Sequence, residues 1–65
     1  MNYIERMELE LSELTTKIDK LTSFMNENNE MYEVLTDTKK DLLLAQVSAM
    51  RAYHTILGMR IEASK

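Results

Sequence analysis

The chain has 65 residues, with no Cys, no Pro, one Gly, one His and a formal net charge of −3 at pH 7. A chain of this length forms one domain with a small core, and without Cys or several His it offers neither a disulfide nor a thiolate or multi-histidine metal site. The acidic balance argues against general DNA or RNA binding. Self-association is therefore the remaining way to stabilise so short a chain.

The sequence shows no catalytic constellation and no membrane-spanning segment. His54 is the only imidazole, no glycine-rich phosphate loop occurs, and the carboxylates of the first half are typical of a solvated helix face. We therefore expect no enzymatic activity, no cofactor and no metal. No apolar run reaches the roughly 18 residues of a bilayer span, and the chain has neither a signal layout nor Cys, so a cytoplasmic location is expected.

Residues 3–25 are predicted to form a long helix. Its apolar side chains recur at alternating spacings of three and four, the heptad seam by which helices pack together. The residues of this seam are Ile4, Met7, Leu11, Leu14, Ile18, Leu21 and Met25. The early turns are rich in Glu, which the positive end of the helix dipole favours.

Residues 26–36 are predicted to connect this helix to a second one. Three Asn occur between positions 26 and 29, and Asn favours turns because its side chain bonds to nearby backbone groups. We expect the short apolar stretch 31–35 to form one helical turn that closes the end of a hairpin. The second long helix is predicted over 37–63, with Thr38 and Asp41 in the spacing of an N-terminal capping box.

The second helix carries two parallel apolar rows, each with heptad spacing. The first row is Leu43, Val47, Met50, His54, Leu57 and Ile61, and the second row is Leu42, Ala45, Ala49, Ala52, Ile56, Met59 and Ala63. One antiparallel partner helix covers only one row, so the other row must face something else. We therefore predict an all-α fold, in which residues 1–65 form a single antiparallel two-helix hairpin that assembles into a homo-oligomer.

Several polar side chains interrupt the apolar surfaces of the second helix. Gln46, Tyr53 and Arg60 lie seven residues apart between the two rows. One interpretation is that they form hydrogen bonds across helices and fix the register, and the other is that they line a pocket between subunits where Arg60 binds an anion. His54, in the first row, is either a core or interface residue or a contact to a ligand.

A second stripe, beside the seam of the first helix, carries Tyr3, Glu10, Lys17 and Phe24. Tyr3 could stack on a base and Lys17 could bind a phosphate, or both could be ordinary surface residues. On one straight helix, Tyr3 and Lys17 are separated by about 21 Å. A small ligand would therefore contact both only if they came from different subunits.

Two stretches resemble a known family. They are Leu43-Leu44-Ala45-Gln46-Val47-Ser48-Ala49-Met50-Arg51-Ala52-Tyr53 with Leu57 and Arg60-Ile61, and Glu13-Leu14 with Lys17-Ile18-Asp19-Lys20-Leu21 and Phe24. They resemble the helical hairpin domain of the phage sponges that counter CBASS and Thoeris bacterial immunity, most specifically in Gln46-x-x-x-Met50. The resemblance covers most of the chain. The sequence shows a shorter N-terminal arm than the better-known members and no additional domain of the Thoeris type.

The resemblance implies a fold, a ligand and a set of site residues. Such sponges assemble as homo-hexamers of interlocked hairpins, and they bind cyclic di- or trinucleotides or cyclic ADP-ribose-type signals without cleaving them, in the cytoplasm of the infected host. By this resemblance Tyr3 would stack on a base and Lys17 would contact a phosphate. Arg51, His54 or Arg60 would line another site near the symmetry axis.

Three hypotheses of function follow. The first is a phage immune-evasion sponge for cyclic nucleotides, which predicts a closed oligomer that is stabilised by its ligand. The second is a homo-oligomeric coiled-coil adaptor or structural phage protein that binds another protein and is indifferent to nucleotides. The third is a small regulator that binds a host enzyme.

Overall fold

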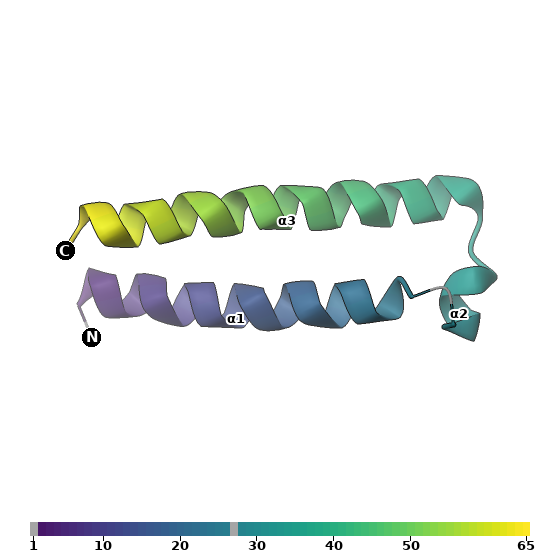
Figure 1. The fold of residues 1–65 in the computed structure, drawn as a ribbon, viewed down its shortest axis with the longest axis horizontal. Helices are drawn as coiled ribbons and strands as arrows, with labels where there is room; N and C mark the ends of the chain where they lie inside the picture. Colours follow the sequence, from purple (N-terminus) through teal and green to yellow (C-terminus); the bar gives the residue numbers. More distant parts are fainter. Residues whose placement is uncertain (1, 27) are drawn as a thin grey trace.

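A computed structural model describes residues 2–26 and 28–65, which form two long antiparallel helices joined through a short helical turn (Figure 1). Helix α1 spans Tyr3–Phe24, α2 spans Glu30–Glu33 and α3 spans Asp37–Ala63. The elements in these residues are all helical, which confirms the predicted all-α fold. The hairpin is a rod 45 Å long with cross-section extents of 16 and 14 Å.

Each helix begins at a polar side chain that caps its first turn. The Asn2 side chain accepts a hydrogen bond from the Glu5 backbone N–H at 2.8 Å, and Asn29 accepts bonds from two N–H groups at the start of α2. Helix α3 is capped by Thr36, whose hydroxyl accepts from Lys39 N–H at 3.2 Å. The sequence pattern favoured Thr38 as the cap, but Thr38 lies inside the first turn of α3, so the capping residue was predicted two positions too late.

The two apolar rows of α3 have different surroundings in the hairpin. The first row faces α1, where Val47 and Leu57 are each 1% exposed and Ile61 is 5% exposed. The remaining members of that row and all seven residues of the α1 seam are half-buried. The core is therefore a single thin layer between two helices, which is little apolar burial for a free-standing domain.

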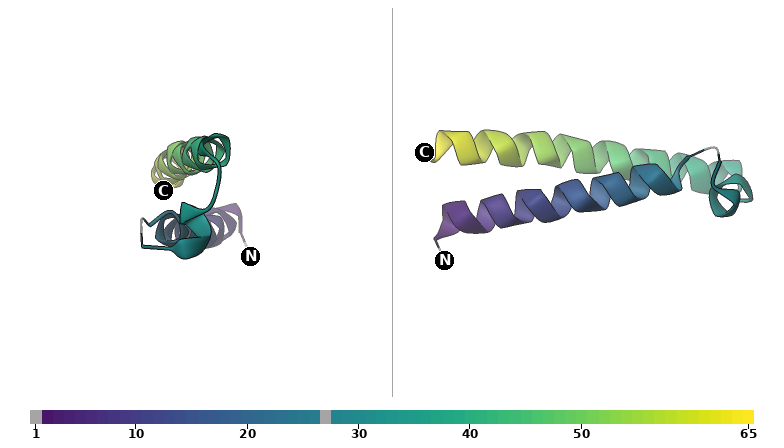
Figure 2. Two further views of the ribbon diagram at one scale, coloured as in Figure 1. Left: turned by 90° about the vertical axis from the view of Figure 1, so that its right-hand side faces the viewer. Right: turned by 60° about the horizontal axis from the view of Figure 1, so that its bottom comes forward.

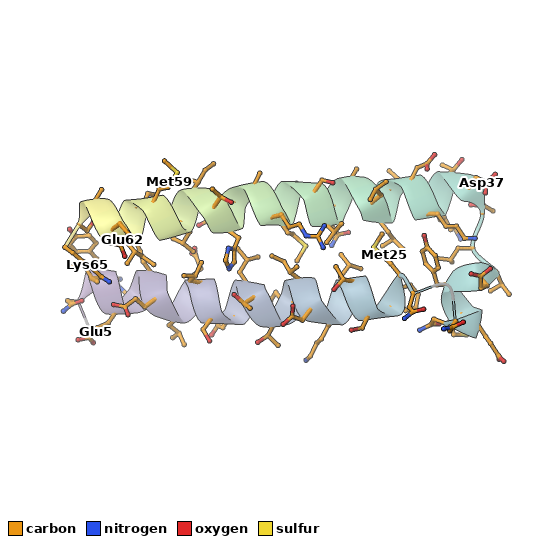
Figure 3. All side chains as sticks on the ribbon, in the orientation of Figure 1. Glu5, Met25, Asp37, Met59, Glu62 and Lys65 are labelled. Carbon is orange, nitrogen blue, oxygen red and sulfur yellow. The ribbon has the colours of Figure 1, made fainter. Side chains whose placement is uncertain are left out.

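All seven residues of the second row are exposed. Leu42 and Met59 each keep 65% of their surface accessible, and Ile56 keeps 52%. Figure 3 shows Met59 on the side of α3 that points away from α1, whereas Met25 of the α1 seam lies between the helices. The prediction that a hairpin partner covers only one row is therefore correct.

The turn between the long helices closes one end of the hairpin. The Phe24 and Tyr32 rings meet edge to face with centroids 6.0 Å apart, and Lys40 Nζ lies 5.1 Å from the Tyr32 centroid. Such aromatic and cation–π contacts fix the direction in which the chain enters α3. Figure 2 shows the two long helices crossing at an angle. The closed end is thus packed by side chains, and we call the opposite end of the rod, where α1 begins and α3 ends, the open end.

Candidate anion-binding site

A groove runs along one edge of the hairpin near its middle. Thr15, Ile18 and Asp19 of α1 and Arg51, His54 and Thr55 of α3 line it, and its volume is 390 Å³. The α3 residues are spaced three and four apart, so they lie on one helix face beside the first apolar row. The groove therefore combines one apolar side chain with a guanidinium, an imidazole, a carboxylate and two hydroxyl groups, and its guanidinium suits a polar ligand that carries negative charge.

A hydrogen bond across the helices sets the orientation of the His54 ring. Nε2 of His54 lies 2.9 Å from Oγ1 of Thr15, and the same hydroxyl donates to the Leu11 carbonyl at 2.9 Å. A hydroxyl has one hydrogen, so when Thr15 donates it to the Leu11 carbonyl, the Thr15 oxygen accepts from Nε2–H of His54. In this neutral tautomer Nδ1 of His54 is an acceptor, which suits a donor group of a ligand and not an anionic oxygen.

Arg51 supplies the positive charge of the groove. Its side chain is exposed and shares the groove with the exposed carboxylate of Asp19. In residues 2–26 and 28–65 the one ion pair joins Lys65 to Glu62, so Arg51 and Asp19 are not paired with each other. The Arg51 guanidinium therefore keeps its donors for an anion, and Asp19 limits how much negative charge the groove tolerates.

A second recess lies at the open end of the hairpin. Tyr3, Arg6, Met7 and Glu10 of α1 and Arg60 of α3 line a volume of 280 Å³, which we call the open-end recess. Tyr3 is 56% exposed, so the face of its ring is accessible. The recess thus places two guanidinium groups beside an aromatic ring that could stack on a base.

Tyr53 ties the two helices together next to this recess. Its hydroxyl donates a hydrogen bond to Oε2 of Glu10, which lies on the facing stripe of α1. The hydrogen bond that the phenol donates to Glu10 raises the pKa of Tyr53, and desolvation and the Glu10 charge act in the same direction. The positive charge of Arg60 and a hydrogen bond from Arg60 to the phenol lower this pKa. Of the stripe Gln46, Tyr53 and Arg60, Tyr53 forms the expected cross-helix bond, whereas Gln46 bonds to Met50 within α3.

The contribution of Tyr53 to stability should depend on pH. Its pKa is raised above the usual value of 10.0, so the folded state favours the protonated phenol. The contribution is therefore fully present below that pH and is lost as the pH rises through the raised value. We expect the difference in unfolding free energy between wild type and Tyr53→Phe, measured by urea unfolding, to shrink above pH 10.0. A difference in unfolding free energy that stays constant as the pH rises would contradict the hydrogen bond from the protonated Tyr53 phenol to Glu10.

Comparison with known proteins shows the family to which the chain belongs. Residues 1–63 match the sequence model of the family named Sequestin. The chain belongs to the Sequestin family. The family name suggests a sequestering protein, which is consistent with the sponge family that the sequence resembles. No curated protein and no solved structure matches this Sequestin.

The predicted site residues lie in different parts of the hairpin. Arg51 and His54 lie together in the middle groove, and Tyr3 and Arg60 lie together in the open-end recess. Lys17 is an exposed residue of α1 that lines neither. Because α1 is continuous, the separation of about 21 Å between positions 3 and 17 holds within one subunit.

Several lining residues were not among the site residues predicted from the sequence, and two of them bear most on the chemistry. Arg6 joins the open-end recess, and Thr15 orients the imidazole in the groove. Arg6 follows Tyr3 by one helical turn, a spacing that places the two side chains on one face. Thr15 carries no comparable signal, because a single Thr on a helix edge resembles any solvated position.

The other features of the described residues do not add a site of another kind. The closed end holds a recess of 380 Å³ lined mainly by Phe24, Leu35, Leu42 and Leu43, which is apolar. Within residues 2–26 and 28–65 no three metal-ligating side chains come together. Neither long helix, as far as it is described, has the length and apolar character needed to cross a bilayer.

Proposed function

We propose that this member of the Sequestin family is a phage anti-defence protein that binds and sequesters a cyclic immune signal. The ligand is a cyclic di- or trinucleotide or a cyclic ADP-ribose-type molecule. The observation that carries the proposal is the match of residues 1–63 to a family named for sequestration. The two recesses on one hairpin, each lined by at least one guanidinium group, support it, because such ligands combine phosphates with bases.

The groove chemistry favours holding a ligand over cleaving it. Arg51 provides charge-assisted donors for a phosphate, and the contact of Nε2 with Thr15 orients the His54 ring beside it. The groove carboxylate, Asp19, is exposed, and an exposed carboxylate is poorly placed to act as a general acid or base at neutral pH. We therefore propose binding without turnover, so that the chain is not an enzyme.

The proposed working form is a homo-oligomer, with a hexamer as the form implied by the resemblance, in the cytoplasm of the infected cell. Its support is the second apolar row of α3, which is exposed along the whole helix. Assembly would also give Lys17 a role. Within one subunit Lys17 is too far from Tyr3 for a shared ligand, but in an oligomer Lys17 of one subunit can reach a ligand that is stacked on Tyr3 of another. Tyr3, Lys17, Arg51, His54 and Arg60 remain the proposed ligand contacts.

A thermal-shift screen tests this function directly. The purified protein is mixed with a panel of cyclic di- and trinucleotides and cyclic ADP-ribose isomers, and each hit is examined by native mass spectrometry. A ligand at a thousandfold excess over its Kd should stabilise the protein by about 4 kcal/mol, which gives a clear shift. Release of the intact ligand on denaturation supports sequestration, whereas release of a cleaved product would overturn it.

The groove is tested by one variant and a matched control. Arg51→Ala should weaken binding of a hit by about tenfold or more, because it removes charge-assisted hydrogen bonds. Lys20→Ala removes a charge from an exposed position of α1 that lines neither recess, and should change affinity little. Equal losses in the two variants would indicate only a general effect of charge.

A protein-binding adaptor is the second candidate function. The observation that favours it is the same exposed apolar row, since a face of this kind also fits a helix of another protein. The screen separates the two functions, because an adaptor binds no member of the nucleotide panel. If the protein is well folded and no compound raises its melting temperature, the adaptor becomes the preferred function.

A further inference from the structure

The open-end recess contains an arrangement of charges that depends on Tyr53. Arg6 and Arg60 supply two guanidinium groups, and Glu10 supplies the one carboxylate among the lining side chains. Arg6 and Glu10 are four residues apart on α1, so they are helix-surface neighbours that can pair. A carboxylate that pairs with either guanidinium would compete with an incoming anion for the same donors.

In the structure this competition does not occur. Oε2 of Glu10 instead accepts the hydrogen bond from the Tyr53 hydroxyl of α3. In the part of the chain that the structure describes, the one ion pair lies elsewhere, between Lys65 and Glu62. The phenol therefore engages the carboxylate on the α3 side of the recess, where Arg60 also approaches the phenol, and among the described residues neither Arg6 nor Arg60 forms an ion pair with Glu10.

We propose that Tyr53 is a positioning residue that restrains the Glu10 carboxylate and so keeps Arg6 and Arg60 available to bind a phosphate-bearing anion, such as a pyrophosphate group, in the open-end recess. Two forked guanidinium groups beside one recess match the several oxygens of a pyrophosphate better than a single cation does. The inference deepens the proposed function and rests on it only in supposing that the natural ligand carries such a group.

The register of the hairpin explains why Tyr53 can act in this way. Glu10 lies seven residues after Tyr3 on α1, and Tyr53 lies seven residues before Arg60 on α3. Because the helices are antiparallel, these equal steps place Tyr3 level with Arg60 and Glu10 level with Tyr53. The Tyr53 phenol therefore lies one heptad farther from the chain ends than Arg60 and is not among the residues that line the recess. It is still close enough to hold the Glu10 carboxylate, which does line the recess.

The test uses inorganic pyrophosphate as the probe with the full-length protein at low ionic strength, where charge effects are least screened. The side-chain Nε–H signals of Arg6 and Arg60 are followed by NMR during the titration, and sodium chloride at matched ionic strength is the blank. In the wild type both signals should shift and saturate. If neither signal responds to pyrophosphate beyond the blank, the recess is not an anion site and the proposal is overturned.

A double-mutant cycle then tests the role of Tyr53 itself. Tyr53→Phe keeps the ring and removes the hydroxyl, and it should lower pyrophosphate affinity about fivefold, because the freed carboxylate can pair with the guanidinium groups. Tyr32→Phe, the same change at the closed end, should have no effect. In the Glu10→Gln background no carboxylate remains to be restrained, so Tyr53→Phe should no longer weaken binding.

The outcomes of the cycle are distinct. Loss of affinity in the wild-type background with rescue in the Glu10→Gln background establishes the positioning role, since a merely structural effect of the hydroxyl would persist in both. Equal losses in the two backgrounds, or no loss in either, overturn it. The failure of this inference can be told apart from the failure of the proposed function. If the protein binds pyrophosphate but none of the nucleotides, this inference stands without the proposed function. If it binds a nucleotide but the Arg6 and Arg60 signals do not respond to pyrophosphate, only the proposed function stands.

Discussion

Replacing Leu57 with alanine should destabilise the protein by about 3 kcal/mol, the largest effect we expect from a single core truncation. Leu57 is 1% exposed and lies in the layer between α1 and α3. Truncation of a buried Leu removes its transfer free energy and leaves a cavity, which together cost about 2–5 kcal/mol. A core of one thin layer has little else to offset such a loss. The measurement is urea unfolding followed by circular dichroism.

Leu44→Ala is the matched control for this prediction. The same side chain is removed from the same helix, but Leu44 is 55% exposed and belongs to neither apolar row. We expect a change within about 0.5 kcal/mol. Both variants are compared at one protein concentration, because self-association adds a concentration-dependent term to stability. Similar losses for Leu57→Ala and Leu44→Ala would show that the core is not where the structure places it.

Substituting Ala49 with glutamate should abolish the proposed assembly while leaving the hairpin helical. Ala49 belongs to the second row of α3 and is exposed in the single hairpin, where Glu is well tolerated in a helix. In an oligomer the same position would be covered, and an unpaired buried charge costs several kcal/mol per copy. Sedimentation velocity should show loss of the assembled species, and circular dichroism should show that helix is retained.

Leu44→Glu controls for the added charge, because it places a glutamate on α3 outside both rows. It should sediment as the wild type does. An Ala49→Glu protein that sediments unchanged would contradict the view that the second row is the contact surface between subunits. A protein that loses its helix would mean that the hairpin itself depends on assembly, and a dilution series of the wild type would then show helix loss together with dissociation.

The helices and their facing sides were predictable from the sequence because they depend on local spacing. The alternation of three and four along α1, and the two rows of α3, are direct consequences of 3.6 residues per turn. The first row, with Val47 and Leu57 at its centre, is the one that faces α1, and the row with Ala49 is exposed. The capping residue of α3 was misassigned because Thr36 and Thr38 both satisfy the local preference.

The candidate site was less predictable, since it depends on the relative register of two helices. The sequence singled out Arg51, His54 and Arg60 without showing which α1 residues face them. The Thr15 contact to His54 and the Glu10 contact to Tyr53 join residues 39 and 43 positions apart, and periodicity alone does not fix such pairs. Lys17 was chosen by resemblance, and the hairpin leaves it away from both recesses of its own subunit.

The positions of the chain ends have a practical consequence for reporters and purification tags. Helix α1 begins and α3 ends at the same end of the rod, beside Tyr3 and Arg60 (Figure 1). A fluorescent label or an oligohistidine sequence attached at either terminus would crowd this end and add its own charge there. Helix α2 lies at the opposite end of a 45 Å molecule, so a peptide inserted between α2 and α3 would report on the protein without touching the open-end recess.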